Sequence, residues 1–138
     1  MSSYKAPLDD MRFALFDVLG AEAQFQRLGF ADATRDVLDA VLDEAARFTE
    51  TVLAPLNPVG DREGCQLDNA TGTVTTPAGF KQAYAKFVDG GWAGLTSPAE
   101  FGGQGLPQLV GVPLKEMIDA ANLAWGNFPL LSHRAIEA

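Results

Sequence analysis

Hydrophobic residues recur at helical spacing over several stretches of the 138-residue chain. The clearest stretch is 34–53, where apolar side chains return every three or four positions and charged side chains fill the places between them. The apolar stripe consists of Val37, Leu38, Val41, Leu42, Ala45, Phe48 and Val52. Asp32 or Thr34 can cap the first turn, and Pro55 is expected to end the helix. The pattern predicts one amphipathic helix over 34–53.

A shorter helix is predicted near the N-terminus, over residues 8–19. Pro7 suits the position before the first turn, acidic residues follow it, and Gly20 is a plausible stop. Its inward stripe is expected to hold Met11, Leu15, Val18 and Leu19, with Phe13 and Phe16 off that stripe. A helix that is apolar on more than one face is expected to be covered by another part of the protein.

The second half of the chain predicts three further helices. One begins at Pro77 with Thr76 as its cap and ends at Gly90 and Gly91, with Phe80, Tyr84, Phe87 and Val88 aligned. Another spans 109–125, and Pro113 is expected either to start its regular part or to bend it. A last helix is expected from Leu130 onwards.

The remaining connections lack a strand pattern of convincing length. Residues 55–76 are predicted to be an irregular connection, in which "TGTVTTP" forms at most a short extended piece. The fold class is therefore all-α, with about five helices joined by long loops rich in glycine and proline.

Composition narrows the function. The net charge is −8, with 47% hydrophobic and 20% charged residues. This acidic balance disfavours binding to nucleic acid and to acidic membrane surfaces. No apolar run approaches the ~20 residues of a membrane span. The N-terminus does not resemble a secretory signal, and a cytoplasmic protein is predicted.

Few side chains suggest chemistry of their own. The single cysteine, Cys65, allows no internal disulfide and has no feature beside it that would activate a thiol. Asp39, Asp43 and Glu50 share the polar face of the predicted helix over 34–53. No histidine or second acidic helix completes a coordination shell, so no metal ligand is assigned and these acids are expected to be solvated.

The stretch "GGWAGLTSPAEFGGQGLP", residues 90–107, carries six of the chain's 14 glycines. A dinucleotide fingerprint needs a strand before its glycines, whereas here a helix is predicted. No Gly-Lys-Ser/Thr sequence follows, so the stretch is not a P-loop. Residue chemistry alone predicts a packed corner between two helices.

The same stretch resembles a loop of acyl-CoA dehydrogenases, in which Gly-Trp is followed by Pro-x-x-aromatic-Gly-Gly-x-Gly. The flanking segments "LAPLNPVGDREG", "EMIDAANLAWGN" and "AIEA" are similar to that family, and "YKAPLDDMRF" is similar to an N-terminal extension of one large subgroup. The resemblance covers nearly the whole chain. It implies an extension helix over 1–28 and the family's N-terminal helical domain over 29–138, truncated at its C-terminal end.

Members of this family oxidise the Cα–Cβ bond of acyl-CoA thioesters. A glutamate removes the α proton and FAD accepts a hydride from the β carbon. The resemblance places that base and the main FAD-binding segments outside this chain, so no catalytic or cofactor-binding residue is assigned, and Glu100, Glu116 and Glu137 are not candidates. FAD is expected in the full-length protein, and none is expected on this fragment.

The resemblance gives one candidate contact with substrate. Residues 127–138 look like the part of the domain that lines the acyl pocket, which nominates Leu131 and Ser132. Packing in the core is an equally good explanation of Leu131. His133 and Arg134 depart from the small residues expected there: either residue could narrow the pocket or reach a polar acyl group, and a surface position is the better explanation of His133.

Two other functions stay open. The chain is alternatively a stand-alone helical interaction module, or a carrier that binds an acyl chain between its helices without the dehydrogenase chemistry. For the leading hypothesis, acyl-CoA is the expected partner of the full-length protein and a homo-oligomer is the expected assembly.

Overall fold

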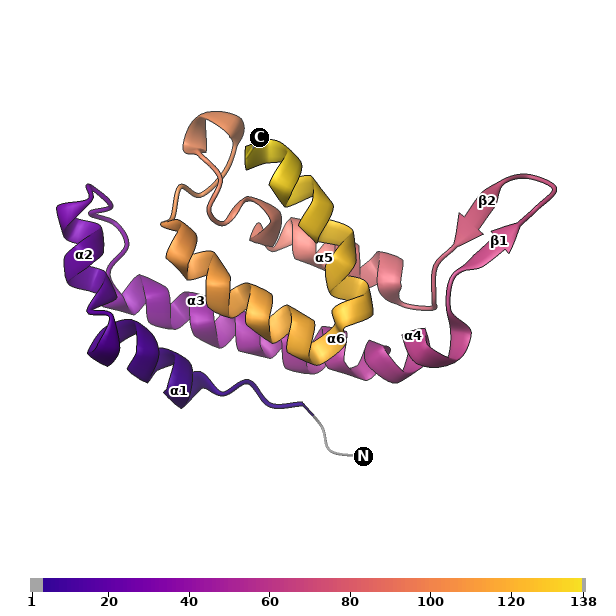
Figure 1. Ribbon diagram of the computed structural model, residues 1–138, viewed down its shortest axis with the longest axis horizontal. Coiled ribbons are helices and arrows are strands. Elements are labelled where there is room, and N and C mark those ends of the chain that lie inside the picture. The colour runs from indigo at the N-terminus through magenta and orange to yellow at the C-terminus, as the bar shows by residue number, and fades with distance from the viewer. Residues whose placement is uncertain (1–3, 138) are drawn as a thin grey trace.

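The computed structural model describes residues 4–137 and the side chains of residues 4–129. The all-α fold class is confirmed, since a single two-stranded hairpin is the only sheet among the described residues (Figure 1). The helices are α1 (Leu8–Arg12), α2 (Ala21–Arg27), α3 (Arg35–Phe48), α4 (Asn57–Glu63), α5 (Phe80–Asp89) and α6 (Gln108–Glu137). The strands are β1 (Gln66–Asp68) and β2 (Thr73–Thr75).

The helix predicted over 34–53 is present as α3 and a following π-helical segment, Thr49–Leu53. Thr34 caps it as predicted, because its hydroxyl accepts a hydrogen bond from the amide of Val37 at 3.4 Å. Pro55 does not end the helical path. The chain continues through a 3₁₀ turn, Ala54–Leu56, into α4, so the irregular connection predicted from residue 55 is wrong over these residues. Pro55 and Pro58 occupy the first turns of these new elements, where a missing amide costs little.

The N-terminal helix begins at Leu8 as predicted, but it changes type. Residues Phe13–Val18 form a π-helix, and Gly20, with φ of +55°, ends it. Met11 and Leu15 are buried as expected, whereas Val18 and Leu19 are 64% and 42% exposed. The wider π turn rotates the later residues away from the face that a 3.6-residue period predicts.

Helix α2 was not predicted. Ala21 and Phe25 lie buried in the same core as Met11 and Leu15, so residues 21–27 pack as a second short helix. Its sequence has too few apolar residues to display a helical period. The extension assigned to 1–28 therefore contains two helices rather than one, and the boundary at residue 28 stays a prediction.

The short extended segment predicted in "TGTVTTP" is present as β2, and it pairs with a strand, β1, that was not predicted. β1 pairs antiparallel with β2, with Leu67 opposite Val74. The turn between them is organised by Asp68, whose carboxylate accepts hydrogen bonds from the amide of Ala70 and the hydroxyl of Thr71, both at 2.8 Å. The hairpin projects away from the helices (Figure 1).

Helix α5 begins later than predicted and ends where predicted. Its N-terminus lies at Phe80, after Gly79 with φ of +85°, so the start at Pro77 with a Thr76 cap is wrong. Gly90 donates to the carbonyl of Lys86, and Gly91 has φ of +74°, as a glycine stop requires. Phe80, Ala83 and Phe87 are buried, while Tyr84 and Val88, expected on the same stripe, are largely exposed.

The two helices predicted from residue 109 onwards are present and share the label α6, since they follow one another directly across a kink. The regular part of α6 begins at Gln108, ahead of Pro113, and the non-helical backbone angles fall at Asn122, with φ of −162° and ψ of 85°. The predicted boundary at Leu130 is wrong, because that residue lies inside the second half of α6. Figure 1 shows this half turning back towards the loop that joins α5 to α6.

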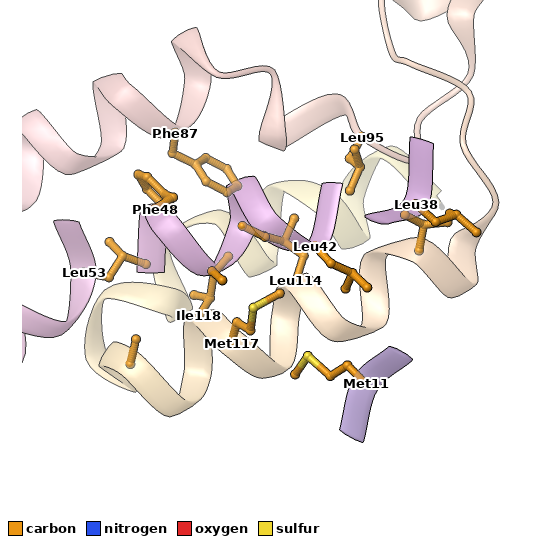
Figure 2. Packing of buried hydrophobic residues seen from close by; sticks show 14 of the residues in the cluster. Met11, Leu38, Leu42, Phe48, Leu53, Phe87, Leu95, Leu114, Met117 and Ile118 are labelled. Carbon is orange, nitrogen blue, oxygen red and sulfur yellow. The ribbon is translucent and has the colours of Figure 1, made fainter. Parts of the chain in front are cut away.

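The core lies between α3, α5 and the first half of α6, with α1 against its lower side (Figures 1 and 2). Leu42 of α3 lies over Met117 and Ile118 of α6, Phe48 of α3 lies beside Phe87 of α5, and Met11 of α1 approaches the same core (Figure 2). Within residues 4–137, no helix combines the length and the hydropathy that crossing a membrane would require.

Candidate functional site

The glycine loop, residues 90–107, is a tight corner closed by its own backbone. The amide of Gln104 donates to the carbonyl of Gly94 at 2.8 Å, and the amide of Gly105 donates to that of Ser97 at 2.9 Å. Gly103 lies so close to Ser97 that a Cβ atom at position 103 would be 2.0 Å from the Ser97 carbonyl oxygen. The two segments of the loop on either side of its turn therefore come so close that only glycine fits at position 103.

This hydrogen bonding decides between the interpretations of the loop. A phosphate cradle needs several backbone amides free to point at a ligand. Here the amides of residues 103–106 all donate to carbonyls within the loop. Trp92 fixes the loop to the core by stacking on Phe48, with ring centroids 6.4 Å apart. The geometry supports the packed corner.

Next to this corner lies an apolar cavity of about 490 Å³. Its wall combines Tyr84 and Phe87 from α5, Trp92 and Leu95 from the glycine loop, and residues from both halves of α6. The first half contributes Gln108, Gly111, Val112, Leu114, Lys115, Glu116, Ile118 and Asp119, and the second half contributes Gly126 and Pro129. A cavity of this size and lining is typical of sites that take a small organic ligand.

The kink in α6 gives the cavity its concave shape. At Gly126 the second half of α6 returns against the first, so that a Cβ atom there would be 2.9 Å from a carboxylate oxygen of Asp119 and 3.0 Å from Ile118. Lys115 forms an ion pair with Asp119 at the same rim. The charged lining residues Lys115 and Glu116 are exposed, whereas the lining residues Phe87, Leu95 and Ile118 are buried.

Asn122, at the kink, is fully buried and uses both ends of its side chain. Its Nδ2 donates to the carbonyl oxygen of Leu53 at 3.2 Å, and its Oδ1 accepts from the amide of Trp125 at 3.0 Å. The second bond caps the first turn of the returning half of α6. The sequence reading missed this residue, although a lone asparagine inside the apolar run "MIDAANLAW" was a usable signal for a helix start.

Trp125 anchors the returning half of α6 on the other elements. It is fully buried, and its ring lies edge-on to Phe48 and Phe87, with centroids 6.2 and 5.5 Å away. Its indole Nε1 donates to the carbonyl of Phe80 at 3.2 Å. Packing of Trp125 against α3 and α5 thus supports the returning half of α6 in this direction.

The acids considered as metal ligands serve a different purpose. Arg12 of α1 lies 2.8 Å from Asp39 and 2.7 Å from Asp43, and Lys5 pairs with Glu50. Hydrogen bonds from Lys5 and from the amide of Ala6 lower the pKa of Glu50. Over the part of the chain that the structure describes, no three histidine, cysteine or acidic residues are grouped as a metal site. These acids hold the N-terminal segment on α3.

The remaining candidate residues belong to the end of α6 and to the start of the hairpin. Leu131 and Ser132, the candidates for the acyl pocket, fall outside the residues whose side chains are described, as do His133 and Arg134. Their backbone belongs to the returning half of α6, which also contributes Gly126 and Pro129 to the cavity. Cys65 is exposed at the start of the hairpin.

No family model matches the chain. It does match two curated proteins along most of its length. It is 41% identical, over 99% of its residues, to the 3-methylmercaptopropionyl-CoA dehydrogenase of Ruegeria pomeroyi. It is 32% identical, over 90% of its residues, to the broad-specificity linear acyl-CoA dehydrogenase of Mycobacterium tuberculosis. The chain spans 23% and 20% of the lengths of these relatives.

The all-α fold is consistent with the N-terminal domain of an acyl-CoA dehydrogenase. The chain corresponds to a part of an acyl-CoA dehydrogenase, which confirms the resemblance seen in the glycine loop and its flanks.

Proposed function

We propose that this chain is the N-terminal domain of an FAD-dependent acyl-CoA dehydrogenase, in which it walls the pocket for the acyl chain. The complete enzyme converts an acyl-CoA thioester to the 2-enoyl-CoA, with loss of a proton from the α carbon and a hydride from the β carbon. The observation that carries this proposal is the apolar cavity beside α6, in a chain that matches two acyl-CoA dehydrogenases over nearly all its residues.

The cavity suits an alkyl chain better than a polar ligand. The buried side chains of Phe87, Leu95 and Ile118 line it, and the charged lining residues Lys115 and Glu116 are exposed to solvent. Each methylene buried in such surroundings stabilises a complex by about 0.8 kcal/mol. Leu131 and Ser132 follow Pro129 on the returning half of α6, and we propose that they extend the same wall.

We propose that FAD is held by residues outside this chain. The amides of the glycine loop that could meet a pyrophosphate donate to loop carbonyls, and the chain as a whole carries a charge of −8. The catalytic base of the proposed enzyme is likewise expected from residues outside this chain, which by itself is expected to be inactive. What this domain contributes is apolar surface, exclusion of water and orientation of the acyl chain.

Oxidation of acyl-CoA by the complete protein tests the proposal. The purified protein is mixed without oxygen with straight-chain acyl-CoAs, and the flavin absorbance and the 2-enoyl-CoA product are followed. The proposal expects a bound flavin that loses its absorbance in step with product formation, and no product from residues 1–138 alone. A flavin-free complete protein, or a flavin that acyl-CoA does not reduce, would contradict it.

The cavity also favours a second function, that of an acyl-chain carrier. Trp92 lies in the cavity wall and reports on it by fluorescence. The carrier hypothesis requires two results. Residues 1–138 bind fatty acids as tightly as the complete protein binds acyl-CoA, and the complete protein contains no flavin. The interaction-module hypothesis lacks a comparable observation.

Assembly and location remain proposals. We propose a homo-oligomer, because Phe13, Val18 and Leu28 leave large apolar side chains exposed around α1 and α2. Light scattering of the complete protein tests this, and a strictly monomeric protein would contradict it. We also propose a cytoplasmic location, which fractionation of the source cells would check.

A further inference from the structure

The cavity is lined from both sides of a single bend. Val112 and Ile118 come before Asn122, and Gly126 and Pro129 come after it. The angle between the two halves of α6 therefore sets how far apart these walls stand. Whatever fixes that angle also fixes the room available to a ligand.

Asn122 connects the bend to the rest of the fold. Its Oδ1 starts the returning half of α6 by accepting from Trp125, and its Nδ2 ties the bend to the carbonyl of Leu53. Leu53 lies where the path of α3 changes from a π-helix to a 3₁₀ turn. The side chain of Asn122 thus lies where the first half of α6 ends, caps the second half, and ties this point to the π-helical segment that follows α3.

A buried asparagine at this position is costly unless both of its polar ends are satisfied. Asn122 is 1% exposed and has a partner at each end. An apolar residue here would remove the acceptor that caps the returning half of α6, and with it an interaction that favours the bend. The asparagine therefore favours the bent form.

We propose that Asn122 is a positioning residue that sets the acyl-chain selectivity of this domain by fixing the angle of α6 and hence the width of the cavity. The selectivity part rests on the proposed function. The angle part does not, because it concerns the geometry of this chain alone.

Two substitutions separate the two hydrogen bonds. Asn122→Ser retains a short acceptor that can cap the turn at Trp125 but cannot reach Leu53. Asn122→Ala loses both bonds. Leu38→Ala serves as the control, because Leu38 is fully buried in α3 and is absent from the cavity wall, so it lowers stability without touching the bend.

The angle is measured in the complete protein by the distance between two spin labels. The labels are placed at Val112→Cys and Asn127→Cys, which are exposed positions on either side of the bend, in a background that carries Cys65→Ser. We expect a single narrow distance distribution for the parent protein and for Leu38→Ala. Asn122→Ser should broaden the distribution, and Asn122→Ala should shift it to longer distances. An unchanged distribution in both Asn122 variants would overturn the proposal, whether or not the protein is a dehydrogenase.

Selectivity is measured as the ratio of kcat/KM values for acyl-CoAs that differ by one methylene. One methylene in an apolar pocket is worth about tenfold in this ratio. We expect the Asn122 variants to move the preferred chain length, with a change of about tenfold in the ratio at the limit of the pocket, while Leu38→Ala lowers all rates in parallel. Parallel loss in the Asn122 variants would overturn the selectivity part. A parent protein that oxidises no acyl-CoA would instead count against the proposed function and leave the distance result to decide the angle.

Discussion

The indole Nε1 of Trp125 donates a hydrogen bond to the carbonyl oxygen of Phe80 at 3.2 Å. This bond joins the returning half of α6 to the first residue of α5, two elements far apart in the sequence. The ring that makes it is fully buried against Phe48 and Phe87. Trp125 therefore holds the returning half of α6, which forms one wall of the cavity, against the core.

Replacing Trp125 should separate the hydrogen bond from the packing. Trp125→Phe keeps an aromatic ring and loses the donor, and the lost hydrogen bond should lower the free energy of unfolding by about 1 kcal/mol. Trp125→Ala also leaves a large cavity and should cost about 3–5 kcal/mol. Urea unfolding followed by circular dichroism measures both. Equal losses in the two variants would contradict the account of the packing.

The glycine loop should be intolerant at Gly103 in particular. A methyl group there would meet the backbone of Ser97 at 2.0 Å, so Gly103→Ala should cost about 3 kcal/mol, the upper end for overpacking. Gly102 is the matched control, since it has φ of +81° and a Cβ atom added there would meet no atom within 4 Å. Gly102→Ala should therefore cost only about 1–2 kcal/mol, from backbone strain alone.

Hydrogen exchange distinguishes these two loop variants further. The amides of Gln104 and Gly105 donate across the loop, so they should be protected in the parent protein and in Gly102→Ala. Both amides should exchange faster in Gly103→Ala, because the added methyl group must push the loop segments around Ser97 and Gly103 apart. Unchanged protection in Gly103→Ala would show that the loop is not closed as described.

Arg12 should contribute more to stability than an ordinary surface arginine. Its guanidinium donates hydrogen bonds to both Asp39 and Asp43 on α3, and its side chain is only 28% exposed. Arg12→Met should therefore lower the free energy of unfolding by about 1 kcal/mol. Arg47 pairs only with Glu44 on the open surface, and Arg47→Met should have little effect. The Arg12 effect should shrink in high salt, because added ions screen the partly exposed pairs. A salt-independent loss would point to packing of the arginine stem instead.

The Glu50 interaction should make stability depend on pH. Its pKa is lowered in the folded state by Lys5 first and by the amide of Ala6 second. A carboxyl group with a lower pKa when folded stabilises the fold above its unfolded-state pKa and loses that contribution as the pH falls through the folded-state value. At neutral pH the parent protein should therefore have a higher Tm than Glu50→Gln. This difference in Tm should disappear as the pH falls below about 4. A gap that persists or widens in acid would contradict this assignment.

The sequence predicted those parts of the fold in which local pattern and tertiary packing agree. The stripe Leu38, Leu42, Phe48 and the glycine stop at Gly91 need nothing beyond helical spacing and backbone freedom. The errors arise where the helical period itself changes. At Phe13–Val18 a π-helix rotates the face, and at Pro55 the helical path continues through a 3₁₀ turn, so a fixed 3.6-residue period misleads at both places.

The cavity could not be predicted from the sequence for a related reason. Tyr84, Leu95, Ile118 and Pro129 meet there because α6 bends at Asn122, and no local pattern states the direction of a bend. The resemblance to acyl-CoA dehydrogenases pointed to the returning half of α6. It gave no indication of α5 or of the glycine loop as walls of the same cavity.

The acyl-length profile of the complete protein with one bulky residue in the cavity wall tests the central claim most directly. Val112 lines the cavity and is 57% exposed, and Val18 is 64% exposed on the N-terminal segment, which supplies none of the cavity lining, so Val112→Trp and Val18→Trp form a matched pair. Flavin reduction is followed for straight-chain acyl-CoAs of increasing length. We predict that Val112→Trp shifts the preference to shorter chains while Val18→Trp leaves the profile of the parent protein. Identical profiles in all three proteins would contradict the claim that this domain walls the acyl pocket.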